Sequence, residues 1–157
     1  MLAPQETRTF FITSATWERR PILQSQPLCD LLLSVIRENR AKARFQLHEF
    51  VFMRDHVHFI LTPAPQVSLE KAVQFIKGGF SFRAKKENMF SGEIWQKGYN
   101  ESWIKDAGEY ARHVDYVWMN PVKARLVERP EMYFYSSARL RAEVDAAPHQ
   151  FQLKAHA

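Results

Sequence analysis

Cysteine is almost absent from this sequence: Cys29 is the single one among 157 residues. An intramolecular disulfide is therefore excluded, and because Cys29 lies in an apolar helical pattern, we expect it to pack in the core. Long apolar runs are missing as well, so no segment is expected to span a bilayer. The opening residues MLAPQETRTF also lack a cationic start followed by an apolar stretch. We expect a cytoplasmic protein with no membrane partner.

Acidic residues are fewer than basic ones, 17 against 22, which gives a formal net charge of +5 and a pI near 9.5. Polyanions are the expected partners, although the charge alone also fits an ordinary basic protein of the cytosol. The hydrophobic content of 46% and the aromatic content of 13% exclude a chain that is disordered throughout. They suit one domain with a sizeable core.

Hydrophobic periodicity predicts an α+β protein. Alternating or β-branched runs predict strands at 8–17, 45–53, 56–62 and 93–99, and helical spacing predicts helices at 27–42, from an N-cap at Ser68, and at 106–119. This order is that of the ferredoxin-like split βαβ fold, with an antiparallel sheet and an added C-terminal helix. Pro121 is expected to end the last helix, because the residue before a proline is disfavoured in the α region.

Periodicity and apolar density fall after residue 140. We therefore predict one domain over residues 1–140 and a C-terminal tail, 141–157, that is mobile or loosely docked.

The segment MRDHVHFILTP carries two histidines, His56 and His58, inside a predicted buried strand. Because successive side chains of a strand point to opposite faces, the two imidazoles share one face and Val57 lies on the other. Neighbouring imidazoles can bind one cation, since histidine is the commonest metal ligand. The same pair also fits two hydrogen-bonded histidines that face a helix, and so short a pattern does not distinguish the two.

A second group lies on the last predicted helix. Arg112, Tyr116 and Asn120 are spaced four residues apart, so a guanidinium, a phenol and an amide share one helical face. Separately, they also fit a solvated charge, a packed aromatic residue and a helix C-terminal residue. Tyr110 lies on another face of this helix and lacks an amide four residues later.

Together these segments resemble a known family. DHVHFILTP and HVDYVWMNPVKARLV, with IKGGFSFRAKK, IWQKGYNESWI and YFYSSARL in the expected order, are similar to the single-tyrosine transposases of the HUH superfamily. The resemblance is to the branch of REP-associated tyrosine transposases and covers residues 7–140. It implies a ferredoxin-like sheet with the tyrosine on a separate helix.

The resemblance also implies an active site. His56 and His58 would hold a divalent metal ion with Asn120 as third protein ligand, and Tyr116 would be the nucleophile. Magnesium or manganese is the ion that the family implies, while zinc and nickel also suit imidazole ligands. The implied enzyme is a transposase. It would cleave and transfer single-stranded DNA at or near a palindromic hairpin through a covalent 5'-phosphotyrosine.

Single-stranded DNA with a palindromic hairpin is thus the expected partner, and the protein would associate with the nucleoid when bound to it. Candidate DNA contacts are the basic residues Arg83, Lys85, Lys86, Arg112, Lys123 and Arg125. One or two of Trp95, Trp103 and Trp118 are expected to stack on unpaired bases. The family includes monomers and homodimers, and no dimer stripe decides between them here.

Two other functions fit the same residues. One is a domesticated protein that binds DNA hairpins without catalysis. The other is a nuclease that uses a metal-bound water and would remain active after Tyr116→Phe.

Overall fold

The computed structural model describes residues 7–152. Its helices and strands are β1 Thr9–Ala15, α1 Gln26–Ala41, β2 Phe45–Phe52, β3 His56–Pro63, α2 Leu69–Lys86, β4 Asn100–Ile104 and α3 Ala107–Lys123. The four strands form one antiparallel sheet in the order β2-β3-β1-β4. The predicted α+β, ferredoxin-like order is confirmed.

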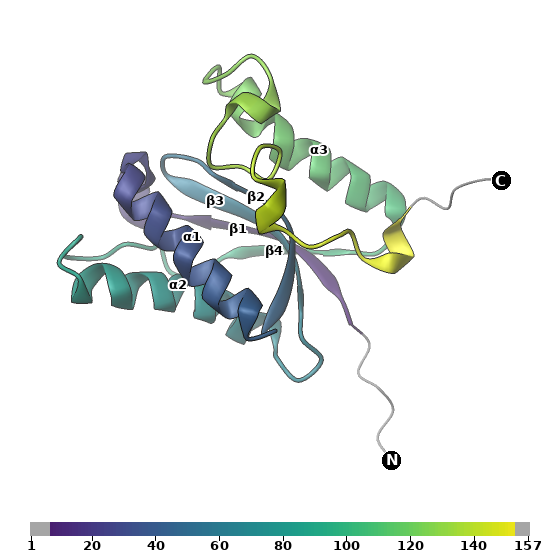
Figure 1. The fold of residues 1–157 in the computed structure, drawn as a ribbon, viewed down its shortest axis with the longest axis horizontal. Helices are drawn as coiled ribbons and strands as arrows, with labels where there is room; N and C mark the ends of the chain where they lie inside the picture. Colours follow the sequence, from purple (N-terminus) through teal and green to yellow (C-terminus); the bar gives the residue numbers. More distant parts are fainter. Residues whose placement is uncertain (1–6, 153–157) are drawn as a thin grey trace.

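The sheet separates two layers of helix: α1 and α2 cover one face, and α3 lies across the other (Figure 1). Val57 and Phe59 of β3 belong to the core on the side of α1 and α2. Ile60 of the same strand packs with Val117 of α3 in the second core. The alternation predicted for β3 is therefore observed, and it leaves His56 and His58 on the face of α3.

Each α-helix of the described chain begins at a side-chain cap. Ser25 Oγ accepts from the Leu28 N–H, and Ser68 Oγ accepts from the Lys71 N–H, as predicted for Ser68. At the start of α3, Asp106 Oδ1 accepts from the Glu109 N–H at 2.8 Å. These caps satisfy N–H groups that have no partner within a helix, so they fix where each helix starts.

The fourth strand lies later than predicted: it covers Asn100–Ile104 and not residues 93–99. In the earlier segment, Lys77 Nζ donates to the carbonyls of Gln96 and Gly98, and Gly98 has a φ of 75°. A left-handed residue interrupts extended pairing, and carbonyls bonded to a side chain are not available to a neighbouring strand. Trp95 keeps a single bridge to Thr16.

Helix α3 continues past Pro121 to Lys123, so the expected stop at Pro121 is wrong. Pro121 lies in the last turn, where its missing N–H costs the helix a single backbone hydrogen bond. Its carbonyl accepts a hydrogen bond from the Leu126 N–H at 3.0 Å. Two residues after the end of the helix, Arg125 adopts a left-handed conformation with a φ of 61°. Asn120 is therefore helical, one turn after Tyr116.

The described part of the C-terminal segment, 141–152, is firmly packed against the domain, contrary to the expected loose docking. The Asp145 N–H donates to the Leu47 carbonyl at 2.7 Å, and the Asp145 carboxylate accepts from the Leu47 N–H at 2.8 Å. Phe151 is buried and stacks on Tyr110. Residues 153–157 lie outside the described residues.

Cys29 is buried, as expected, and its thiol donates to the Leu23 carbonyl. Burial raises the pKa of the Cys29 thiol to about 12. Among residues 7–152, no helix combines the length and the hydropathy needed to cross a membrane.

Candidate active site

The two histidines of β3 lie side by side under α3. Their ring centroids are 4.8 Å apart, and the rings are nearly perpendicular. His58 is buried, whereas the His56 side chain is 19% exposed. The pair therefore opens toward solvent on the side of His56, where a ligand can reach it.

Each imidazole is held through its Nδ1 atom. His56 Nδ1–H donates to Asp55 Oδ1 at 2.7 Å, and His58 Nδ1 is hydrogen-bonded to Thr13 Oγ1 at 2.8 Å. Thr13 faces His58 directly across the β1–β3 pair. Carboxylate and hydroxyl partners of this kind commonly orient histidines that bind a metal through the other ring nitrogen.

The remaining nitrogen of His58 has no partner in the part of the chain that the structure describes. His58 Nε2 is fully buried and makes no hydrogen bond with any residue between 7 and 152. A buried polar atom of this kind costs free energy unless a ligand satisfies it. The pKa of His58 is lowered to about 3, mainly by burial and to a smaller extent by the nearby His56 and Arg19. The ring is therefore neutral at physiological pH and has a lone pair to offer.

Tyr116 lies beside this pair. Its ring centroid is 5.3 Å from that of His58, and Tyr116 is 46% exposed. The ring of Phe11 lies beside both, with its centroid 5.7 Å from that of Tyr116 and 5.2 Å from that of His58. The next residue, Val117, is buried against the sheet. The phenol is thus exposed to solvent at the rim of the histidine pair, where a large substrate can approach.

A buried carboxylate fixes helix α3 on the sheet. Glu49 of β2 accepts from Trp118 Nε1 at 2.6 Å, from Ser137 Oγ at 2.8 Å and from Arg141 Nη1 at 2.8 Å. Three donors from two other segments therefore satisfy one buried acidic group. They connect the helix that carries Tyr116 both to the sheet and to the C-terminal segment.

Asn120 is half-buried on α3, one turn after Tyr116, and its amide makes no side-chain hydrogen bond within residues 7–152. No group of three or more His, Cys, Asp or Glu side chains in that range could hold a metal ion. Two imidazoles with free Nε2 atoms nonetheless suit a divalent cation, provided that a different donor, such as an amide oxygen, adds to them.

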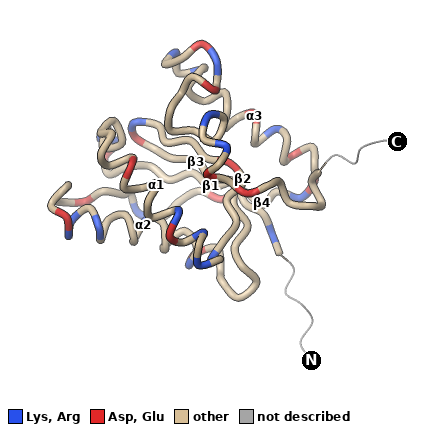
Figure 2. Tube along the Cα trace, viewed as in Figure 1, with Lys and Arg blue, Asp and Glu red and all other residues tan. Residues whose placement is uncertain are grey.

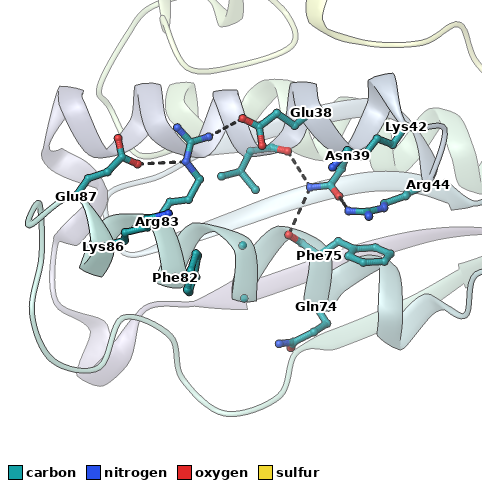
Figure 3. Close-up of a pocket in the computed structure, with 13 residues that line it drawn as sticks. Glu38, Asn39, Lys42, Arg44, Gln74, Phe75, Phe82, Arg83, Lys86 and Glu87 are labelled. Atoms are coloured by element: carbon teal, nitrogen blue, oxygen red, sulfur yellow. Dashed lines mark hydrogen bonds and ion pairs between the residues drawn. The ribbon is translucent and has the colours of Figure 1, made fainter.

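The basic candidates for DNA contact fall on both sides of the sheet (Figure 2). Arg112, Lys123 and Arg125 are exposed at α3, and Lys123 Nζ lies 6.0 Å from the centroid of the Tyr116 ring. Arg83, Lys85 and Lys86 lie on α2, on the opposite face. There Arg83 is paired with Glu38 and Glu87 in a groove of about 630 Å³ between α1 and α2 (Figure 3).

Of the three tryptophans considered, one is accessible. Trp95 is buried and donates to the Lys77 carbonyl, and Trp118 is bonded to Glu49. Trp103 is 42% exposed, with the Arg8 and Lys105 side chains near its ring.

Sequence reasoning missed the residues that orient the site. Asp55 directly precedes His56, so a carboxylate next to a candidate ligand was a usable signal. Thr13 and Glu49 become visible only once the strand register and the position of α3 are known.

Comparisons with known proteins show the family to which this chain belongs. The family model for the IS200-like transposases matches residues 8–119. The REP-associated tyrosine transposase of Escherichia coli (strain K12) is 27% identical over 140 residues, which cover 84% of this chain and 81% of that protein. The solved structure of a REP-associated tyrosine transposase bound to a REP hairpin has the same fold. Its TM-score is 0.70 at 23% identity, covering 100% of this chain and 92% of that one. The chain therefore belongs to the IS200-like transposase family, and its resemblance to REP-associated tyrosine transposases is confirmed.

Proposed function

We propose that this protein cleaves and rejoins single-stranded DNA at or near a palindromic hairpin, with Tyr116 as the nucleophile. The observation that carries the proposal is the exposed Tyr116 ring, 5.3 Å from the ring of His58, whose buried Nε2 has no partner among the described residues. A nucleophile and a vacant ligand atom thus lie at one rim. The proposed transposase domain covers residues 1–140.

His56, His58 and Asn120 would hold a divalent ion, magnesium or manganese, which when bound neutralises charge that builds on the scissile phosphate. Asp55 and Thr13 keep the Nδ1 atoms engaged, so the two imidazoles present Nε2. Asn120 supplies an oxygen donor from the helix of Tyr116. The two elements β3 and α3 therefore have to stay in fixed register for the site to work.

The phenol oxygen of Tyr116 attacks the phosphorus atom, and the bond from phosphorus to the 3' oxygen breaks. The DNA is left with a 5'-phosphotyrosine and a 3'-hydroxyl, and the phenol proton ends on the leaving oxygen or on water. One phosphodiester replaces another, so the step is reversible. Attack by a 3'-hydroxyl from a second strand restores Tyr116 and joins that strand. The positive charge of Lys123 near the Tyr116 ring favours the approach of the phosphate.

Hairpin DNA is proposed as substrate because the curated relative is REP-associated and the solved neighbour is bound to a REP hairpin. Arg112, Lys123 and Arg125 are exposed on the side of Tyr116 and are the proposed phosphate contacts. Arg83, Lys85 and Lys86 would need DNA to reach the opposite face. The protein would act in the cytoplasm on nucleoid DNA, as a monomer or a homodimer.

The test is incubation of the protein with a labelled single-stranded hairpin oligonucleotide, taken from repeats beside its gene, and magnesium or manganese. A denaturing gel then separates free DNA from adduct. We expect an adduct that needs the metal and is lost in Tyr116→Phe, while Tyr99→Phe, a half-buried tyrosine on the opposite face, retains it. Cleavage by Tyr116→Phe at the wild-type rate would instead indicate a metal-water nuclease. Binding without cleavage would indicate a hairpin-binding protein.

A further inference from the structure

A second pocket lies next to the active site, outside the residues assigned so far. It has a volume of about 490 Å³ and lies between the start of α1, the β2–β3 turn and the loop after α3. That loop is drawn in yellow-green at the top of Figure 1. Arg54, Leu126, Tyr133, Phe134 and Tyr135 are among its lining residues.

The pocket and the histidine pair share one short turn. Arg54 lines the pocket, and the next two residues are Asp55 and His56, which are hydrogen-bonded to each other. The Leu23 N–H donates to the Arg54 carbonyl at 3.0 Å, which ties this turn to the start of α1. The pocket therefore lies close to His56.

Apolar side chains are unusually exposed here. Phe134 is 49% exposed and Leu126 is 42% exposed, and Met132 of the same loop is 48% exposed. Clustered apolar exposure on a protein of this size marks an interaction site. The polar tips of the two tyrosines are already bonded, Tyr133 to the Phe52 carbonyl and Tyr135 to Asp30. The rings are therefore held in place.

The charge of the pocket suits a phosphate-bearing ligand. Arg54 is exposed and forms no ion pair within residues 7–152, and no carboxylate lines the pocket. Arg139 adds a second cation, 5.6 Å from the centroid of the Phe134 ring. Flat aromatic surfaces beside free cations are the combination that binds single-stranded nucleic acid.

The groove between α1 and α2 is less suited, although it also has an exposed phenylalanine, Phe82, near Lys86. There the carboxylates of Glu38 and Glu87 line the groove and neutralise Arg83 (Figure 3). Lys42, Arg44 and Lys86 also line the groove, so its charge does not exclude DNA. The groove is less suited because it lies between α1 and α2, on the face of the sheet opposite to Tyr116.

We propose that the pocket lined by Arg54 and Phe134 binds an unpaired base of the DNA strand that Tyr116 cleaves, by stacking on Phe134 with Arg54 at the adjoining phosphate. The identity of the ligand rests on the proposed function. The pocket would thus hold the single-stranded part of the substrate, beside the hairpin, and set which phosphate reaches Tyr116.

The test compares two labelled probes by fluorescence anisotropy without added metal: a hairpin with a single-stranded extension and the same hairpin with blunt ends. Phe134→Ala is expected to weaken binding of the extended probe about tenfold, the effect of losing one base–aromatic stack. The affinity of the Phe134→Ala variant for the blunt hairpin should equal that of the wild type. The matched control is Phe82→Ala, which removes an even more exposed ring near a lysine and is expected to change the binding of neither probe. Arg54→Gln should also weaken only the extended probe.

Four results would overturn the proposal: no preference of the wild type for the extended probe, an equal loss on both probes, no loss in Phe134→Ala, or a loss in Phe82→Ala instead. Sedimentation of the wild type and Phe134→Ala adds a fifth, since a dimer that dissociates in the variant would show that a second copy covers the pocket. Because no cleavage is needed, failure of the Tyr116 adduct and failure of the pocket are separate results.

Discussion

Trp118 of α3 donates its indole N–H to the buried carboxylate of Glu49 at 2.6 Å, on the other side of Val117 from Tyr116. Residues on either side of Val117 are each turned about 100° from it around a helix axis. The Trp118–Glu49 bond on one flank therefore sets the rotation of α3 that keeps Tyr116 near His58 on the other flank.

Trp118→Phe should impair both stability and catalysis. Loss of a hydrogen bond to a charged group is expected to lower the free energy of unfolding by about 1.5–3 kcal/mol in urea denaturation. At a temperature where the variant is fully folded, the single-turnover rate of adduct formation should fall by on the order of tenfold or more, because small misplacement of a nucleophile is costly. Trp95→Phe is the control for the rate, because it removes an indole hydrogen bond to the Lys77 carbonyl in the core on the opposite side of the sheet. An unchanged rate would show that Glu49 does not position Tyr116.

Asp55→Asn should weaken the affinity for manganese by about 10- to 100-fold, the usual effect of removing a carboxylate that orients a histidine ligand. Isothermal titration calorimetry on the protein without DNA measures this directly. Asp115→Asn, which changes an exposed carboxylate on α3, is the matched control. Equal affinities of the two variants would contradict the orienting role of Asp55.

Stability should fall as the pH is lowered from 7 toward 4. Burial is the main cause that lowers the pKa of His48, whose Nδ1–H donates to the Ala146 carbonyl. The unfolded chain, with a histidine pKa of about 6.5, then binds more protons than the native state, so stability increases with pH in this window.

In His48→Gln the dependence on pH should be shallower but not flat, because His58, with its pKa lowered to about 3, titrates in the same direction. Urea denaturation at a series of pH values measures the slopes. A slope as steep as that of the wild type would show that His48 is not the responsible group.

Asp145→Ala should destabilise the protein by about 1–3 kcal/mol, because the Leu47 N–H loses the carboxylate that accepts its hydrogen bond. Arg40 loses its ion-pair partner in the same variant. Hydrogen exchange at the Leu47 amide should accelerate more than the global change in stability explains. Asp115→Ala is expected to change neither quantity. Unchanged exchange at Leu47 would contradict firm docking of this segment.

Local patterns in the sequence were enough to predict the order of elements and the face that His56 and His58 share, because strand alternation and helix spacing depend only on neighbouring residues. The position of β4 depended on Lys77, whose ammonium group donates hydrogen bonds to the carbonyls of Gln96 and Gly98, about twenty residues later. The helical state of Asn120 depended on how late in α3 Pro121 falls. Contacts of Asp145 with β2 are tertiary, with no local pattern to indicate them.

The chain segment that runs along β2 also affects how the sheet meets other molecules. Phe52 N–H donates to the Tyr135 carbonyl, Ser137 N–H to the Phe50 carbonyl and Asp145 N–H to the Leu47 carbonyl. These bonds occupy the outer backbone groups of β2, so this edge cannot add a strand from another molecule. The opposite edge is the five-residue β4, short and largely exposed, with charged Glu101 within it. A covered edge and a short charged one are the two features that protect sheets against aggregation, so the folded protein is expected to stay dispersed at high concentration.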